Sequence, residues 1–361
     1  MTITMDIKKT ISILLFFIIY LFSTSYANDG VYYTSGSMLI PVQETDITVE
    51  KEILTISLCD DGYARVDVQY VFNNRGPEKV LKVGFEAARP YNTIDTIDPT
   101  GRHPYISDFT VIMNGQPLRH SNAVVVANRI NEIYTGPEEG VPEEFGAYAY
   151  AYYFRAEFKP GINKVHHTYK YKMSYGVGRT FEVPYWLTPA TRWGNGQIDD
   201  FTLRIKAEGT EKHFVIEDSI FRAAEFRIVD GTGKIRHSQY GWSGSLVEVA
   251  LRNGTVEWHS VNFKPEKDMN IQSADTYIAF NKEFPLGSFY DRSDNFYFWT
   301  DKKIPKTLVN ALPYAHRGYV FRKKKLQKLF SSFWWYMPDP EYVKSTKDFT
   351  PREHRLLLEH K

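Results

Sequence analysis

The feature that most constrains this chain is a two-residue alternation of apolar and polar side chains that returns along most of its length. It is clearest at Val66–Phe72, and it returns at Phe201–Ile205 and Val247–Leu251. Successive side chains of a β-strand point to opposite faces, so each run predicts a strand with one apolar face. Such strands need a second layer on which their apolar faces can pack.

The runs are separated by short sequences that are typical of tight turns. Asp60–Gly62, Asn114–Gly115 and Asn253–Gly254 each place a glycine after Asp or Asn. These residue types tolerate the positive φ angles that a tight β-hairpin turn requires. We therefore predict a mainly β chain in which residues 28–300 form an antiparallel β-sandwich, either as one unit or as two subdomains.

The first residues have the pattern of a secretory signal. The basic pair Lys8–Lys9 precedes an uncharged apolar run, Ile11–Phe22, that is short for a membrane span. Ser25–Ala27 supplies small residues where a signal peptidase reads, so we expect cleavage after Ala27; an uncleaved anchor is the alternative. No later stretch is apolar enough to cross a bilayer. We expect an exported protein, periplasmic or extracellular, with no transmembrane span in the mature chain.

Cys59 is the only cysteine, so no disulfide can form within the chain. It ends the apolar run Ile53–Cys59, and a cysteine in such a run usually behaves as a small core hydrophobe rather than as a nucleophile. We expect it to be buried and to take no part in catalysis.

The charge is nearly balanced overall, at +1, but it is unevenly distributed. Residues 301–361 contain 14 Lys and Arg against 6 Asp and Glu, so the rest of the chain carries an acidic surplus. Either the two parts dock on each other, or the basic part binds an anionic cell-wall or glycan polymer, lipopolysaccharide or an envelope protein. Because an exported chain does not meet nucleic acid, we expect no nucleic-acid partner.

The pattern changes from strand to helix in the basic part. Arg322–Phe333 has apolar residues at positions 326, 329, 330 and 333 with lysines opposite, which predicts an amphipathic helix. Thr350 can cap a second helix, Pro351 suits its first position, and Glu353 can complete a capping box. The predicted organisation is a signal peptide, a β-sandwich domain and a helical domain, at residues 1–27, 28–300 and 301–361.

Many positions of the basic part, in order and with matching gaps, agree with a known family. They are Asn310, Tyr314-Ala315, Gly318-Tyr319-Val320-Phe321, Leu326, Phe330, Trp335-Tyr336, Thr350 and Glu353. In these positions the segment from about Lys302 to Lys361 resembles the YARHG domain, a small domain of exported bacterial proteins. The family name spells Arg before His, whereas here His316 precedes Arg317. The resemblance implies an extracytoplasmic, non-catalytic module whose ligand is not established.

Four side chains at the centre of this motif are candidates for ligand binding: Tyr314, His316, Arg317 and Tyr319. Arginine offers a planar fork for carboxylate or phosphate, and tyrosine offers a flat face with a polar tip. The alternative, which we prefer, is that the motif is a turn between helices in which Gly318 takes a backbone angle that only glycine accepts easily. In that case the aromatic and basic side chains clamp neighbouring helices.

Three adjacent aromatic residues, Trp334, Trp335 and Tyr336, are further ligand-binding candidates. They could form a stacking platform for sugars, but neighbours in an extended segment point in opposite directions. We expect one tryptophan to close the small helical core. The basic run Arg322–Lys325 is either a solvated helix face or a contact for a polyanion.

No catalytic or metal-binding pattern is present. Paired carboxylates such as Asp60–Asp61 and Asp199–Asp200 are adjacent in the sequence, which does not by itself give the geometry of a glycosidase. His166 and His167 are neighbours in a strand-like run and so face opposite sides. We expect no catalytic residues, metal or cofactor, and an exported, non-enzymatic protein that binds or scaffolds at the cell envelope. The alternative is an envelope hydrolase that acts on peptidoglycan or glycan through a site in the β body.

Overall fold

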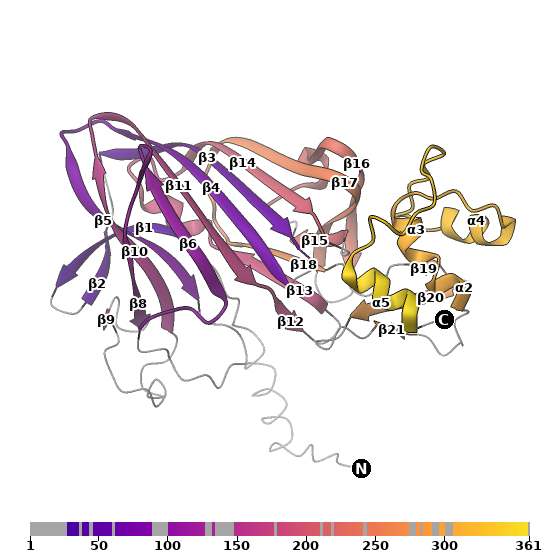
Figure 1. Cartoon of the computed structure of the whole chain (residues 1–361). Helices are drawn as coiled ribbons and strands as arrows, with labels where there is room; N and C mark the ends of the chain where they lie inside the picture. The colour runs from indigo at the N-terminus through magenta and orange to yellow at the C-terminus, as the bar shows by residue number, and fades with distance from the viewer. Residues whose placement is uncertain are drawn as a thin grey trace, which may run out of the picture.

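The computed structural model describes residues 27–35, 38–42, 46–59, 62–88, 100–126, 132–133, 148–176, 179–209, 212–217, 220–240, 244–273, 279–281, 284–290, 296–299 and 306–359. Apart from Ala27, the predicted signal peptide lies outside these described residues. Among the described residues, strands dominate as far as residue 299, with two short 3-10 helices at Thr188–Arg192 and Ala223–Glu225, and the described α-helices follow residue 299 (Figure 1). The prediction of a mainly β chain with a short helical C-terminal region is confirmed.

The larger sheet has 12 strands among the described residues, and β16 pairs with β17 beside its main path. The order is β12 (Ser174–Gly176), β13 (Arg179–Tyr185), β18 (Met269–Ser273), β15 (His213–Glu217), β17 (Gly244–Phe263), β14 (Ile198–Ala207), β3 (Ile47–Leu58), β4 (Tyr63–Asn74), β11 (Gly161–Lys172), β6 (Ile106–Met113) and β7 (Gln116–Pro117), with β16 at Arg227–Tyr240. Its pairings are antiparallel except that β3 and β14 run parallel. The sheet is therefore mixed, where the sequence predicted antiparallel pairing throughout.

A second sheet closes on itself. Its strands follow the order β1 (Ala27–Ser35), β2 (Met38–Val42), β9 (Glu132–Ile133), β8 (His120–Val126), β10 (Tyr148–Phe158) and β5 (Lys79–Ala88), and β5 returns to pair with β1. Three short strands form a small separate sheet, β19 (Ala279–Asn281), β20 (Phe284–Tyr290) and β21 (Phe296–Trp299).

The two main sheets pack face to face through aromatic side chains. Phe85 of β5 lies 5.6 Å from Phe109 of β6 and 4.8 Å from Tyr169 of β11, measured between ring centroids. Phe72 of β4 meets Phe158 of β10 edge to face at 5.5 Å. Rings in such arrangements add to the stabilisation from burial alone. These contacts join the sheets in one hydrophobic core, as the alternating pattern requires.

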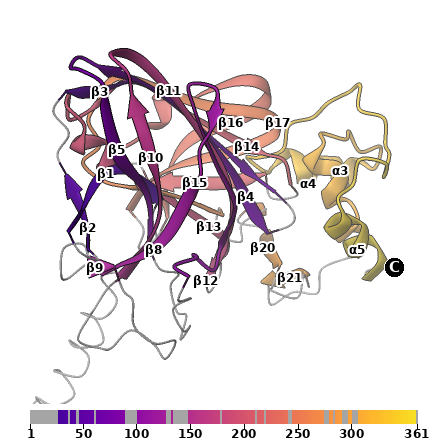
Figure 2. The ribbon, with the colours of Figure 1, turned by 60° about the vertical axis from the view of Figure 1, so that its left-hand side comes forward.

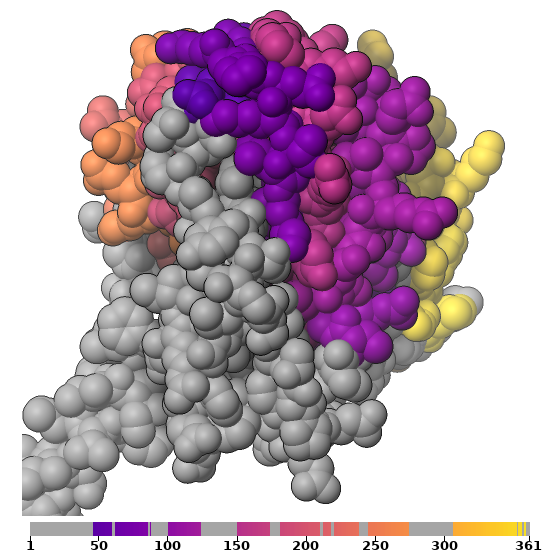
Figure 3. Space-filling view, turned by 90° about the vertical axis from the view of Figure 1, so that its left-hand side faces the viewer, coloured from indigo at the N-terminus to yellow at the C-terminus, as the bar shows by residue number. Residues whose placement is uncertain are grey.

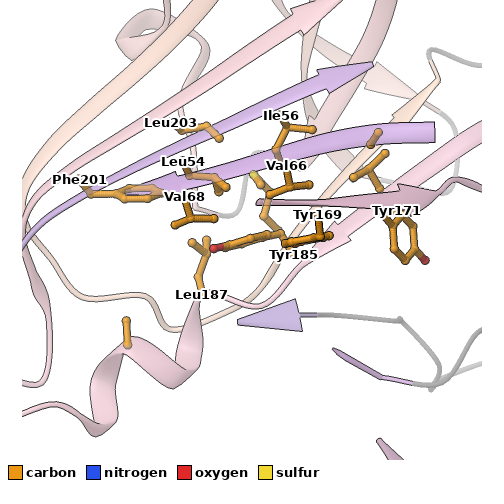
Figure 4. Close-up of a cluster of buried hydrophobic side chains, with 14 of the residues drawn as sticks. Leu54, Ile56, Val66, Val68, Tyr169, Tyr171, Tyr185, Leu187, Phe201 and Leu203 are labelled. Atoms are coloured by element: carbon orange, nitrogen blue, oxygen red, sulfur yellow. The ribbon is translucent and has the colours of Figure 1, made fainter. Parts of the chain in front are cut away.

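The core of the large sheet takes the residues that the alternation marked. Val66, Val68, Tyr70 and Phe72 are all buried, and each is at most 4% exposed. Figure 4 shows Val66 and Val68 beside Leu54 and Ile56 of the neighbouring strand β3 and near Tyr169. Cys59 is buried, as expected, and it is not part of a disulfide bond.

Two of the predicted turns lie where strands meet. Asn114 and Gly115, with φ angles of 50° and 82°, make the two-residue turn between β6 and β7. Gly62, with φ of 78°, precedes β4 after its antiparallel partner β3. In both places the chain needs positive φ, which Asn and Gly provide at low cost.

The prediction of a turn at Asn253–Gly254 is wrong. β17 runs without a break from Gly244 to Phe263, and β16 pairs along most of it with irregular register. Gly254 lies opposite Gly231, and a Cβ at Gly254 would lie 1.4 Å from the carbonyl oxygen of Asp230. The two glycines therefore allow close contact between the backbones of long strands instead of reversing the chain.

Four short helices follow the sheets: α2 (Lys306–Val309), α3 (Leu312–His316), α4 (Lys324–Ser331) and α5 (Pro351–Glu359). Figures 1 and 2 both place α3, α4 and α5 at the end of the molecule away from β1, β2 and β9. On the face in Figure 3, which looks on the opposite end, the yellow C-terminal residues are visible only along one margin. We call residues 306–359 the helical region and the β-strands the body.

Candidate ligand-binding site

The motif that starts at Tyr314 is the C-terminal cap of α3. Gly318 has a φ of 82°; its N–H donates to the Ala315 carbonyl at 2.9 Å, and the Tyr319 N–H donates to the Tyr314 carbonyl at 3.0 Å. These two bonds define a Schellman motif, which favours glycine at its left-handed position. A Cβ at Gly318 would also lie 2.5 Å from the carbonyl oxygen of Met337. The predicted backbone angle of Gly318 is confirmed, and the close carbonyl of Met337 is a second reason for glycine at this position.

Arg317 lies at this cap and is bound by the chain itself. Its two terminal nitrogens donate to the two carboxylate oxygens of Glu353, each at 2.7 Å, and further to the carbonyls of Pro313 at 2.9 Å and Asp348 at 2.6 Å. The guanidinium also lies 4.6 Å from the centre of the Phe349 ring. Burial opposes its charge, but the Glu353 carboxylate raises the pKa of Arg317 above its ordinary value. Arg317 therefore joins α3 to the start of α5.

Glu353 also completes the capping box of α5. Its backbone N–H donates to the Thr350 hydroxyl at 3.2 Å, and the Thr350 N–H donates to the Glu353 carboxylate at 2.9 Å. This is the reciprocal pair that the sequence predicted. One buried carboxylate thus holds both a helix start and the guanidinium of Arg317, so the start of α5 and the end of α3 depend on each other.

His316 faces the opposite way, toward the body. Its ring meets the edge of Trp335 with the centroids 4.8 Å apart. Burial, together with the positive charges of Arg317, Lys212 and His213, lowers the pKa of His316 to about 3. The imidazole is therefore neutral at physiological pH, and it lies close to cationic groups of the body.

The three adjacent aromatic residues do not share one exposed surface. Trp335 and Tyr336 are buried, at 6% and 3% exposure, in the core of the helical region. Tyr336 also donates its hydroxyl to the Tyr319 carbonyl at 2.8 Å. Trp334 turns to the body, where the Arg236 guanidinium lies 4.2 Å from its ring centre. One tryptophan closes the small core, as expected, and the other packs against the large sheet.

The body holds this segment mainly with cations. Lys234 of β16 donates to the carbonyls of Trp334 and Tyr336, both at 2.9 Å. Arg252 of β17 lies 3.4 Å from both the Met337 carbonyl and an Asp339 carboxylate oxygen. Opposite charge therefore plays a small part in this contact, because the body supplies positive groups to a region that is itself basic. The positive charge of the helical region is left largely for solvent or a partner.

Replacing Lys234 with methionine should loosen the contact between the body and the helical region. Two carbonyls lose a charged donor, and hydrogen bonds to charged groups are worth about 1.5–3 kcal/mol. We expect amide hydrogen exchange around residues 334–337 to become roughly ten-fold faster, because about 1.4 kcal/mol corresponds to a factor of ten. Lys164→Met, at an exposed position of β11, is the control. Equal exchange in both variants would contradict the role of Lys234.

A groove of about 820 Å³ opens in the helical region on the other side of the motif. Its apolar walls are Leu308, Ala311, Phe321, Leu326 and Leu329, together with Tyr314 and Tyr319. Four cationic residues also line it: Arg322, Lys323, Lys325 and Lys344. The Lys344 ammonium lies 4.4 Å from the ring centre of Tyr314 and 5.8 Å from that of Tyr319. The volume of the groove is within the usual range for small-ligand pockets, about 300–1,000 Å³.

The groove divides the predicted ligand-binding residues into two groups. Tyr314 and Tyr319 line it, whereas His316, Arg317, Trp334, Trp335 and Tyr336 do not. Arg322 and Lys325 belong to the basic run that the sequence indicated as a polyanion contact. Lys344 was missed, because it lies in an irregular segment and meets the tyrosines only through the tertiary fold.

Histidine–carboxylate pairs occur in the part of the body that the structure describes. His166 and Asp67 lie 2.8 Å apart, and about 40% of each side chain is exposed. His213 donates to Glu248 at 2.7 Å, and Arg236 binds the same carboxylate. Burial raises the pKa of Glu248, but these two hydrogen bonds outweigh it and lower that pKa to about 2. Neither pair lines the groove, and the non-enzymatic prediction stays a prediction.

Among the described residues, no group of three or more His, Cys, Asp or Glu side chains is arranged to hold a metal ion. The described helices are also too short or too polar to cross a membrane.

Two domain families match the chain. Residues 308–361 match the YARHG domain, and residues 27–137 match a family described as Domain of unknown function (DUF4424). The resemblance of the C-terminal segment is thereby confirmed, and the motif of that domain is the helix cap described above. No curated protein matches the sequence.

Among solved structures, the chain is similar to a candidate nutrient-binding protein from Legionella pneumophila, at 16% identity and a TM-score of 0.47, with 94% of this chain and 100% of that chain covered. It is also similar to an M1 zinc metallopeptidase from Deinococcus radiodurans, at 11% identity and a TM-score of 0.25, with 62% and 44% covered. Likenesses this remote say nothing about a ligand or an activity of this chain.

Proposed function

We propose that this chain, which carries a YARHG domain at its C-terminal end, is an exported, non-enzymatic protein that binds an anionic component of the cell envelope. The support is one observation: Arg322, Lys323, Lys325 and Lys344 gather around an apolar groove. Within the described residues, none of the four side chains forms an ion pair. Like charges held close together cost free energy that an anionic partner relieves.

The arrangement of the two parts favours an open site. The helical region contacts the body through Trp334, Tyr336, Met337 and Asp339, and none of these residues lines the groove. Within the part of the chain that the structure describes, these contacts with the body leave the groove uncovered. The leader-like residues 1–27 support delivery to the envelope, where anionic polymers and lipids are present.

Reversal of one groove charge should weaken binding of a soluble polyanion. We expect Lys325→Glu to reduce the affinity of the full chain for dextran sulfate by roughly ten-fold, equivalent to about 1.4 kcal/mol, measured by calorimetry at low salt. Lys328→Glu is a matched control, because Lys328 is an exposed residue of the same helix, α4, but does not line the groove. Equal losses in the two variants, or no binding to dextran sulfate by the wild-type chain, would contradict the proposal.

A further inference from the structure

The groove has apolar walls, and a fully hydrophilic polymer has no apolar surface to pack against them. Its walls carry Leu308, Phe321, Leu326 and Leu329, and the faces of two tyrosines extend them. Burying apolar surface stabilises a complex by about 25 cal/mol per Å². A sugar or phosphate chain that lies on the cations alone leaves the partly buried members of these walls, which are Leu326, Leu329, Tyr314 and Tyr319, in contact with water. The groove therefore fits a ligand that has an apolar part as well as a charge.

The charges lie where the head group of such a ligand would be. Arg322 and Lys323 precede α4, Lys325 lies in its first turn, and Lys344 comes from the later loop to cover the tyrosine rings. Several positive side chains around one opening suit a head group with more than one negative charge. Arginine in particular binds phosphate through two parallel hydrogen bonds.

We infer that the occupant of the groove is the acyl chain of a phosphorylated lipid, with its phosphate on Arg322, Lys323, Lys325 and Lys344. This inference rests on the proposed function and names its ligand class. The apolar walls hold the chain, and the cations hold the head group. A free phosphate lacks the first contact, and a zwitterionic lipid gains less from the second because its own cation meets the four positive groups.

Binding of three soluble probes to the full chain separates these contributions. The probes are oleoyl lysophosphatidic acid, oleoyl lysophosphatidylcholine and glycerol 3-phosphate, each below its micelle concentration. We expect lysophosphatidic acid to bind at least ten-fold more tightly than lysophosphatidylcholine, and glycerol 3-phosphate not to bind measurably. Glycerol 3-phosphate binding as tightly as lysophosphatidic acid, or equal affinity for the two lipids, would overturn the inference.

A variant that fills the groove tests the acyl chain directly. Thr307 of α2 is exposed and lines the groove, so Thr307→Trp places a large ring there without removing a core side chain. We expect this variant to bind lysophosphatidic acid at least ten-fold more weakly and dextran sulfate as the wild-type chain does. Thr346→Trp, at an exposed position that does not line the groove, is the control.

The outcomes distinguish the inference from the proposed function. The lipid inference is contradicted if Thr307→Trp leaves lipid binding unchanged, or if the wild type binds dextran sulfate but no lipid. Neither result contradicts the proposal that the chain binds a polyanion. If neither lipid nor dextran sulfate binds, both fall. Should Thr307→Trp fail to fold by circular dichroism, Leu326→Asn replaces it, because Leu326 is a partly exposed wall residue on α4.

Discussion

Replacing Arg317 with methionine is expected to destabilise the helical region by about 3–5 kcal/mol, because it leaves the buried Glu353 carboxylate without its cation. The Arg317 and Glu353 side chains are only 12% and 2% exposed, so water cannot take over the lost contacts. Arg317 also donates to two backbone carbonyls, at Pro313 and Asp348. We expect much faster amide exchange in α3 and α5 than in the strands of the body.

A double-mutant cycle separates this pair from the other contacts of Arg317. Glu353→Leu alone leaves the guanidinium unpaired and should also destabilise strongly, while Arg317→Met with Glu353→Leu should cost less than the sum of the single changes. The exchanged order, His316→Arg with Arg317→His, moves the guanidinium to the side of Trp335 and should be as damaging as Arg317→Met. Additive single changes, or a stable exchanged variant, would show that Arg317 does not brace the region.

The motif could be predicted in part because its chemistry is local. The φ requirement of Gly318 and the capping box between Thr350 and Glu353 depend on residues at most five positions apart, so local spacing alone predicts them. The partner of Arg317 could not be predicted in this way. Glu353 lies 36 residues further along the chain, and only the fold of the intervening segment brings the two together.

The strands show the same division between local and distant causes. Alternation predicted the buried face of β4, because the period of a strand is a property of its own backbone. At Asn253–Gly254 the sequence predicted a turn, yet the glycine is needed for contact with Gly231 on β16. An Asn-Gly pair has the same sequence signal in a hairpin turn and at a close approach between strands.

Some residues of the groove could be predicted from the sequence, but their assembly around one hollow could not. The basic run at Arg322–Lys325 was visible, and its polyanion interpretation was left open. That Tyr314, Tyr319 and Lys344 meet that run around one hollow follows from packing of α2, α3 and the loop before α5. The charge difference between the two parts suggested docking by opposite charge, but Lys234, Arg236 and Arg252 show the body giving cations to the contact.

Acid should destabilise the folded body through His167 well before its carboxylates titrate. His167 is fully buried and packs against the rings of Tyr70, Phe85 and Phe109. Burial, and to a lesser degree the charge of His166, lowers the pKa of His167 from 6.5 to about 3, although Asp67 opposes this. Between these two values the unfolded chain binds more protons than the folded chain. The free energy of unfolding is therefore highest above pH 6.5 and falls as the pH drops, by about 1.4 kcal/mol per unit.

As the pH falls from 7.5 to 5, protonation of His167 in the unfolded chain should lower the free energy of unfolding of the body by about 2 kcal/mol, measured by urea denaturation at each pH. His167→Phe keeps an aromatic ring in the core and should remove that pH-dependent loss. Because the readout is the difference between two pH values in one variant, a constant cost of the substitution cancels.

Measurements stop at pH 5 because Glu248, with a pKa of about 2, contributes stability that is lost only as the pH falls below about 4.5. His354→Phe, at an exposed position of α5, is the control; a His167→Phe protein that loses as much stability in acid as the wild type would show that His167 is not the group responsible.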